Sequence, residues 1–126
     1  MRLLLDTVTF VWAMASPERI SRAGIAAIKP GSAVLELSAI SLAEIAIKQA
    51  RGKLDLTSRD LRTAVEDLKL RVLSYSAAHA YRLFDLPFHH ADPFDRLIIA
   101  QALAEGIPVV TSDEKFRLYR GLEVIW

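Results

Sequence analysis

The sequence predicts an α/β fold in which helices cover both faces of a mostly parallel sheet. Three observations lead to this fold class. Short apolar runs alternate along the chain with segments of helical periodicity. The apolar runs are continuous rather than interrupted by polar residues, as in strands that are buried on both faces. Because no repeat, low-complexity stretch or linker divides the 126 residues, we expect one domain over residues 1–126.

The apolar runs are the expected strands, and they lie at residues 2–5, 33–40, 71–75, 107–111 and 122–125. Segments with helical periodicity lie between them, at residues 10–14, 22–28, 41–51, 58–68, 77–85, 93–105 and 113–119. Pro17, Pro30 and Gly31 mark the breaks around the first two helices, and residues 53–57 and 87–91 are expected as loops.

Capping residues support the helices in the first half of the chain. Ser21 can cap the helix over residues 22–28, and Ser58 can cap the helix that follows it. Ser41 and Glu44 have the spacing of a capping box, which predicts that a helix opens at Ser41. Gly52 then suits the position just past the end of that helix.

The helix over residues 93–105 is predicted with both of its ends marked. Asp92 suits the N-cap, and Pro93 suits the first helical position. Gly106 suits the position just past the last turn, and Pro108 blocks any continuation. The first turn also carries Asp95, an acid that the helix dipole favours at this end. Apolar residues lie on more than one side, so we expect this helix to be largely buried.

Composition limits the classes of protein to consider. A formal net charge of +1 means that any nucleic-acid binding needs a local basic patch. The lack of cysteine excludes disulfides and thiolate metal sites and fits a reducing compartment. No run reaches the roughly 18 apolar residues needed to cross a membrane. Asp6 interrupts the apolar start of the chain, so we read residues 2–5 as a strand rather than a signal peptide and expect a cytoplasmic protein.

Four carboxylates are expected at one edge of the sheet. Asp6 ends the first strand, Glu44 lies on the first turn after the second, and Asp113 follows the fourth. Asp95 joins them if its helix runs antiparallel to that fourth strand. Each acid has a structural alternative, as a turn residue, a capping-box partner or a helix cap. Together they would repel one another, because two like charges about 4 Å apart cost on the order of 4 kcal/mol at an effective dielectric of about 20.

A cation or bound protons would relieve this repulsion. The candidate ligands are all oxygen atoms, because cysteine is absent and the adjacent His89 and His90 point in different directions and are read as loop residues. An oxygen ligand set favours Mg²⁺ or Mn²⁺ over zinc. Such an ion can activate water and stabilise charge on a phosphoryl oxygen. The residues alone therefore predict a metal-dependent phosphoryl-transfer site, of which phosphodiester hydrolysis is one example.

Four segments hold the expected acids and their neighbours: Leu3-Leu4-Leu5-Asp6-Thr7, residues 40–48, Asp92-Pro93-Phe94-Asp95-Arg96 with the residues up to Ala102, and Val110-Thr111-Ser112-Asp113. Together they resemble PIN-domain ribonucleases, and more narrowly the VapC-type toxins of bacterial toxin–antitoxin pairs. The resemblance implies a three-layer α/β/α sandwich with a central, mostly parallel sheet. It also implies hydrolysis of RNA with Mg²⁺ or Mn²⁺. By position, the catalytic and metal-binding residues would be Asp6, Glu44, Asp95 and Asp113.

Further polar residues are expected around this acidic site. They are Asp92, Thr7, Thr111 and Ser112. Asp92 is expected as a helix cap or a supporting carboxylate. The three hydroxyls would orient carboxylates or waters, or would only cap the strand ends. Similar proteins often have a histidine in place of Val8 and an aromatic residue in place of Ala43, so these departures concern the substrate cleft rather than the metal site.

The resemblance also implies a homodimer and a VapB-like antitoxin, which docks a helix and an extended arm over the active site. A docked helix needs an apolar groove. Candidate groove residues are Trp12, Leu54, Leu56, Leu61 and Leu68. Candidate contacts to RNA phosphates are Lys48, Arg51, Lys53 and Arg96. The plain alternatives are that the apolar stripe belongs to the core and that the charges form a solvated face.

Two other functions stay open at this point. A haloacid-dehalogenase-like, Mg-dependent phosphatase also starts from an aspartate at the end of a strand. It would need a second aspartate two residues later, where this chain has Val8. A catalytically silent PIN-like binding module would have lost one or more of the acids, whereas all four are present.

Overall fold

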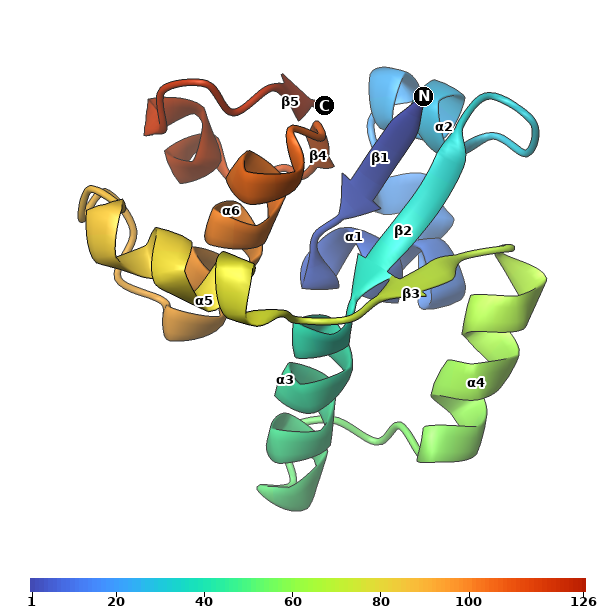
Figure 1. Cartoon of the computed structure of the whole chain (residues 1–126). Helices are drawn as coiled ribbons and strands as arrows, with labels where there is room; N and C mark the ends of the chain where they lie inside the picture. The colour runs from blue at the N-terminus through green and yellow to red at the C-terminus, as the bar shows by residue number, and fades with distance from the viewer.

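The computed structural model describes residues 1–126 and confirms the α/β fold, with a single five-stranded sheet (Figure 1). The strands are β1 (Arg2–Leu5), β2 (Val34–Ser38), β3 (Arg71–Leu73), β4 (Val109–Val110) and β5 (Val124–Ile125). Their order across the sheet is β3-β2-β1-β4-β5, and every neighbouring pair is parallel. All five strands therefore end at the same edge of the sheet, where sites form in open α/β folds.

An α-helix forms in each segment predicted from helical periodicity except residues 113–119, where the chain forms only a 3₁₀ turn. The α-helices are α1 (Thr7–Ala15), α2 (Arg22–Ile28), α3 (Ala39–Ala50), α4 (Ser58–Asp67), α5 (Ala77–Arg82) and α6 (Pro93–Glu105). Three short 3₁₀ turns accompany them: η1 (Pro17–Arg19), η2 (Leu83–Asp85) and η3 (Glu114–Leu118). The segment predicted as one helix over residues 77–85 is thus α5 continued by η2. None of these helices is both long enough and apolar enough to span a bilayer.

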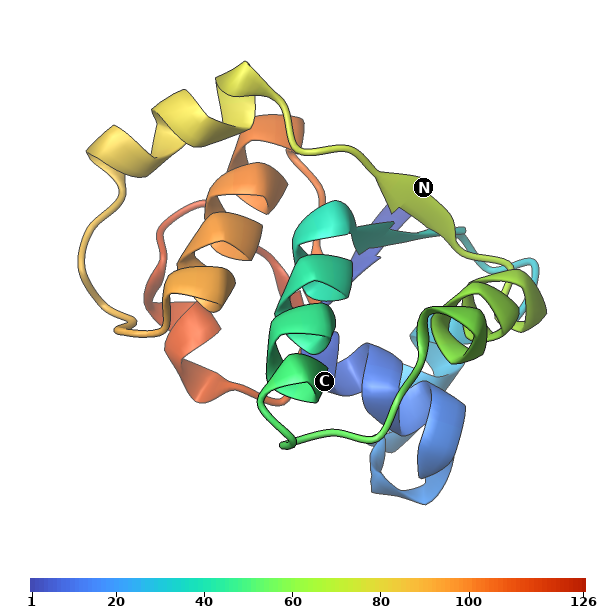
Figure 2. The same ribbon diagram turned by 90° about the horizontal axis from the view of Figure 1, so that it is seen from below.

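The two faces of the sheet carry separate cores, which confirms the three-layer sandwich. Leu3 and Leu5 of β1 belong to a cluster with buried side chains of α1, α3 and α4. Leu4, which points to the opposite face, belongs to a cluster with α6 and η3. Figure 2 views the molecule from below, where α3 and α6 lie side by side. These two helices bring residues from separate parts of the chain to the edge where the strands end.

The predicted start of α3 was wrong. The strand expected over residues 33–40 ends at Ser38, whose hydroxyl accepts a 3.0 Å hydrogen bond from the Ile40 N–H and so caps the helix. Ser41 is not a cap: it lies inside the helix, fully buried, and its hydroxyl accepts a hydrogen bond from Thr7. Ser41 and Glu44 have the spacing of a capping box but do not form one. Glu44 therefore lies in the second turn of α3 rather than the first.

The cap of α4 also differs by one residue from the prediction. Thr57, not Ser58, is the N-cap, because it forms a reciprocal capping box with Asp60 three residues later. The prediction for α6 is confirmed at both ends. The Asp92 carboxylate accepts from the N–H groups of residues 94 and 95, and Gly106 adopts the left-handed conformation with a φ of 66°. The position of Asp95 in the first turn of α6 is thereby set locally.

Candidate functional site

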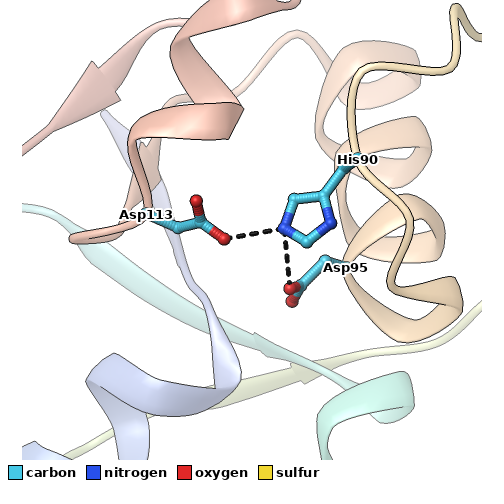
Figure 3. A group of neighbouring side chains, drawn as sticks. All are labelled: His90, Asp95 and Asp113. Carbon is cyan, nitrogen blue, oxygen red and sulfur yellow. Dashed lines mark hydrogen bonds and ion pairs between the residues drawn. The ribbon is translucent and has the colours of Figure 1, made fainter.

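Three side chains converge at the edge where the strands end, and Figure 3 shows them. They are His90 from the loop before α6, Asp95 from the first turn of α6, and Asp113 from the turn after β4. The Nε2 atom of His90 lies 2.7 Å from a carboxylate oxygen of Asp113 and 3.1 Å from one of Asp95. One ligand atom from each residue falls within a group no wider than 4.8 Å. Asp6 and Glu44 stand outside this tight group but close to it.

Asp6 lies at the end of β1 and is 3% exposed. One carboxylate oxygen accepts from the Thr9 N–H at 2.9 Å, so Asp6 is also the N-cap of α1. The other accepts from the Thr111 hydroxyl at 2.6 Å. The oxygen of Thr111 in turn accepts from the Asp113 N–H, so this one hydroxyl connects two of the expected acids. Burial is the main cause that raises the pKa of Asp6, and the negative charge of Asp113 acts in the same direction.

Glu44 is 4% exposed and reaches the site from α3. One of its oxygens accepts from the ammonium of Lys48, one helical turn later. The other oxygen, Oε1, is buried and has no hydrogen-bond partner. A buried acceptor without a partner costs about 1–3 kcal/mol, and more when it is charged. A bound ligand could provide the partner that no protein group provides for this oxygen.

The pKa of Asp95 is raised to about 7. Burial is the largest cause, and the neighbouring Asp92 carboxylate is the second. The charges of Asp6 and Glu44 raise the pKa further, whereas His90 opposes the shift. The expected acids therefore influence one another electrostatically, as anticipated for carboxylates at one edge of the sheet. Near neutral pH, a bound proton or a nearby cation would offset the negative charge of these carboxylates.

His90 is the residue that the sequence analysis missed. His89 and His90 were both read as loop residues, but only His90 is buried, at 7% exposure. The exposed His89 packs edge-on to the ring of Tyr119 instead. The group of ligand atoms therefore includes a nitrogen and is not all oxygen. The available signal was the placement of His90 two residues before a helix cap, which is weak without knowledge of what lies opposite.

The other expected supporting residues have mixed placements. Asp92 caps α6, as described above. The Thr111 hydroxyl donates to Asp6, whereas the Thr7 hydroxyl donates to Ser41 at 2.8 Å and not to a carboxylate. Ser112 is half-buried, and its hydroxyl forms no hydrogen bond. Thr111 is thus the hydroxyl that the structure connects directly to the acids.

The four expected RNA contacts also differ in their surroundings. Lys48 is paired with Glu44, and Arg51 and Lys53 are exposed. The guanidinium of Arg96 donates at 3.0 Å to the carbonyl of residue 87 and lies 4.4 Å from the centre of the Phe88 ring. Arg96 therefore supports the loop that carries His90 rather than pairing with an acid.

The donor set fits a hard divalent cation. It consists mainly of carboxylate oxygens, which Mg²⁺ and Mn²⁺ prefer. A positive charge at this edge would give the unpartnered oxygen of Glu44 a partner. It would also favour the ionised form of Asp95, whose pKa is raised. The residues present are therefore compatible with such an ion, and Asp6, Glu44, Asp95 and Asp113 are the ones that would hold it.

Comparisons with known proteins cover nearly the whole chain. The PIN domain family matches residues 3–122. Ribonuclease VapC22 from Mycobacterium tuberculosis is 31% identical over 120 residues, which cover 94% of this chain and 92% of that protein. In the crystal structure of Rickettsia felis VapBC2 bound to a promoter DNA fragment, one chain aligns with a TM-score of 0.72 at 20% identity, covering 98% of this chain and 97% of that one. A chain of the DNA-bound VapBC from Salmonella typhimurium aligns with a TM-score of 0.71 at 20% identity, covering 98% of this chain and 96% of that one.

Proposed function

Because the chain belongs to the PIN-domain family, and within it to the VapC type, we propose that it is a metal-dependent endoribonuclease toxin that a cognate antitoxin neutralises. The observation that carries the proposal is the set of buried and half-buried carboxylates that follow β1 and β4 or lie on α3 and α6. One of their oxygens has no partner, and the pKa of one carboxyl is about 7. The match to the PIN domain family favours a nuclease over the haloacid-dehalogenase-like phosphatase. In this proposal the protein acts on RNA and works in the cytoplasm. The homodimer stays a prediction from the resemblance.

Asp6, Glu44, Asp95 and Asp113 would hold Mg²⁺ or Mn²⁺. When bound, the ion supplies the Lewis acid that activates water and stabilises charge on the scissile phosphate. The chain itself contributes orientation: Thr111 fixes one oxygen of Asp6, and Lys48 fixes one oxygen of Glu44 while leaving the other free. The pKa of Asp95 is raised to about 7, so a cation that binds there would compete with a proton on this carboxyl.

The experiment that tests the function is induction of this chain alone in a bacterial host, beside Asp6→Ala, with total RNA separated on a gel. We expect growth arrest and discrete RNA fragments with the parent chain, and neither with the variant. Purified parent protein should also cleave RNA with Mn²⁺ and stop when a chelator is added. A folded protein that binds no Mn²⁺ and cuts no RNA would instead support the silent binding module.

The antitoxin would occupy an apolar groove between α3 and α4, with a volume of about 700 Å³. Two of the expected groove residues, Leu56 and Leu61, line it. The other three do not: Leu54 and Leu68 pack against the core, and Trp12 packs at a tilt against Trp126 with ring centres 5.9 Å apart. One face of α3 lines the groove, while another carries Glu44 to the acidic site. A partner helix in this groove would lie on the other side of α3 from the acidic site.

Ala46→Glu is expected to abolish neutralisation while leaving RNA cleavage unchanged. Ala46 is exposed and lines the groove, so a docked helix would bury an unpaired carboxylate there. Such burial costs several kcal/mol, which weakens antitoxin binding at least about 100-fold. Calorimetry with the cognate antitoxin measures this, with Ala50→Glu as the matched control because Ala50 is exposed on the same helix outside the groove. Equal affinities for the two variants would place the antitoxin elsewhere.

A further inference from the structure

His90 lies beside Asp95 and Asp113 in the acidic site, and the contacts of its two ring nitrogens indicate its role. Nε2 faces Asp113 at 2.7 Å and Asp95 at 3.1 Å (Figure 3). A nitrogen in this position could act in two ways. It could give its lone pair to a metal as a ligand, or it could donate a hydrogen to a carboxylate that binds the metal. The two roles require the ring hydrogen on different nitrogens.

The other nitrogen decides between these roles. Nδ1 of His90 accepts a 3.1 Å hydrogen bond from the backbone N–H of Asp92. In neutral imidazole one nitrogen accepts and the other donates, so the ring hydrogen lies on Nε2. The hydrogen bond from Nε2 goes to Asp113. Histidine ligands of metals usually donate their other N–H to a carboxylate or carbonyl. Here that other nitrogen faces a donor, which is the opposite arrangement.

Binding of a metal at Nε2 would disturb the start of α6. The ring hydrogen would then lie on Nδ1 and face the N–H of Asp92, so that hydrogen bond would be lost. Asp92 is the residue whose carboxylate caps α6 and so positions Asp95. The loop has little freedom to adjust, because the Tyr119 hydroxyl accepts from the backbone N–H of His90 at 2.9 Å. The ring itself packs edge-on against Phe116.

We propose that His90 is a positioning residue, which donates its Nε2–H to Asp113 and holds that carboxylate beside Asp95, and that it is not a metal ligand. This inference rests on the proposed function, because the arrangement matters only if the carboxylates bind a cation. A neutral N–H offsets part of the repulsion between the two carboxylates without removing the negative charge that attracts the metal. The nitrogen in the group of ligand atoms thus organises the oxygen ligands and does not change the preference for Mg²⁺ or Mn²⁺.

Two spectroscopic measurements test the tautomer in the full-length protein. Nuclear magnetic resonance with nitrogen-labelled histidine should show the hydrogen of His90 on Nε2, both without metal and with saturating Mg²⁺. Pulsed electron paramagnetic resonance of the Mn²⁺-loaded protein should show no coupling from a directly bound nitrogen. A hydrogen on Nδ1 in the Mg²⁺ form, or a strong nitrogen coupling to Mn²⁺, would overturn the proposal.

Variants distinguish a hydrogen-bond donor at position 90 from a side chain that only fills space. His90→Ala should weaken Mn²⁺ binding about 10–100-fold, the range for loss of a residue that supports a metal ligand. His90→Gln keeps an N–H donor near the place of Nε2 and should bind Mn²⁺ within a few-fold of the parent chain. The neighbouring His89→Ala is the matched control and should bind Mn²⁺ like the parent chain. Circular dichroism checks that each variant is folded, and a folded His90→Gln as weak as His90→Ala would contradict the role as donor.

Failure of this inference can be distinguished from failure of the proposed function. Mn²⁺ binding is measured without RNA, so a parent chain that binds Mn²⁺ but cuts no RNA would overturn only the nuclease proposal. A parent chain that binds no Mn²⁺ would overturn both. Cleavage with a histidine nitrogen bound to Mn²⁺ would overturn only the role assigned to His90.

Discussion

Replacing Asp95 with Asn is expected to abolish RNA cleavage while the protein stays folded. The substitution keeps the shape of the side chain, and the cap of α6 comes from Asp92 rather than from Asp95. It removes one of the four negative charges that would hold the cation, so Mn²⁺ binding and the cleavage rate should both fall at least about 100-fold. Calorimetry with Mn²⁺ and a cleavage assay on the purified variant measure the two effects.

Asp67→Asn is the matched control for this variant. Asp67 ends α4 and is exposed, so its replacement makes the same chemical change away from the acidic site. We expect it to cleave RNA and bind Mn²⁺ like the parent chain. If Asp95→Asn unfolds while Asp6→Asn does not, Asp95 is chiefly a residue of the helix N-terminus and its assignment to the metal site is wrong.

The metal-free protein is expected to lose stability as the pH rises from about 4 to about 7. The folded Asp95 carboxyl has a pKa of about 7, above its ordinary value of 3.8. Across this interval the folded protein keeps a proton that the unfolded chain has lost, so the free energy of unfolding falls with rising pH. The contribution is fully present below the unfolded pKa and is lost once the pH passes the folded pKa. With allowance for the partial exposure of this carboxyl, we expect a loss of about 2 kcal/mol.

Comparison with Asp95→Asn isolates this contribution from those of other groups. The lowered pKa values of Asp60 and Glu105 act in the opposite direction on stability, but they are shared by both proteins. Chemical denaturation without metal should therefore show that the stability gained by the variant grows between about pH 4 and about pH 8. Saturating Mg²⁺ should stabilise the parent chain more than the variant, because only the parent keeps all four carboxylates. A gain that is the same at both pH values would mean that Asp95 is not the source.

Local features of the sequence determined much of this protein. The caps of α6 at Asp92 and Gly106 depend on contacts within a few residues, so they could be read directly. The continuous apolar runs predicted strands buried on both faces, and the parallel order followed from the helices between them. Because parallel strands end at the same edge of the sheet, this direction alone predicted that Asp6 and Asp113 lie at one edge. The Thr111 hydroxyl connects the two residues, because it donates to a carboxylate oxygen of Asp6 and accepts from the backbone N–H of Asp113.

Other features were decided only by the tertiary structure. Ser41 was predicted as the cap of α3, but its hydroxyl accepts from Thr7, 34 residues away, and Ser38 caps the helix instead. His90 looked like its neighbour His89, and only the placement of Asp113, 23 residues later, gave it a partner. The physical reason is common to both cases. A hydrogen bond between nearby residues depends on local backbone geometry, whereas a contact between distant residues exists only once the sheet and its two helical layers have packed.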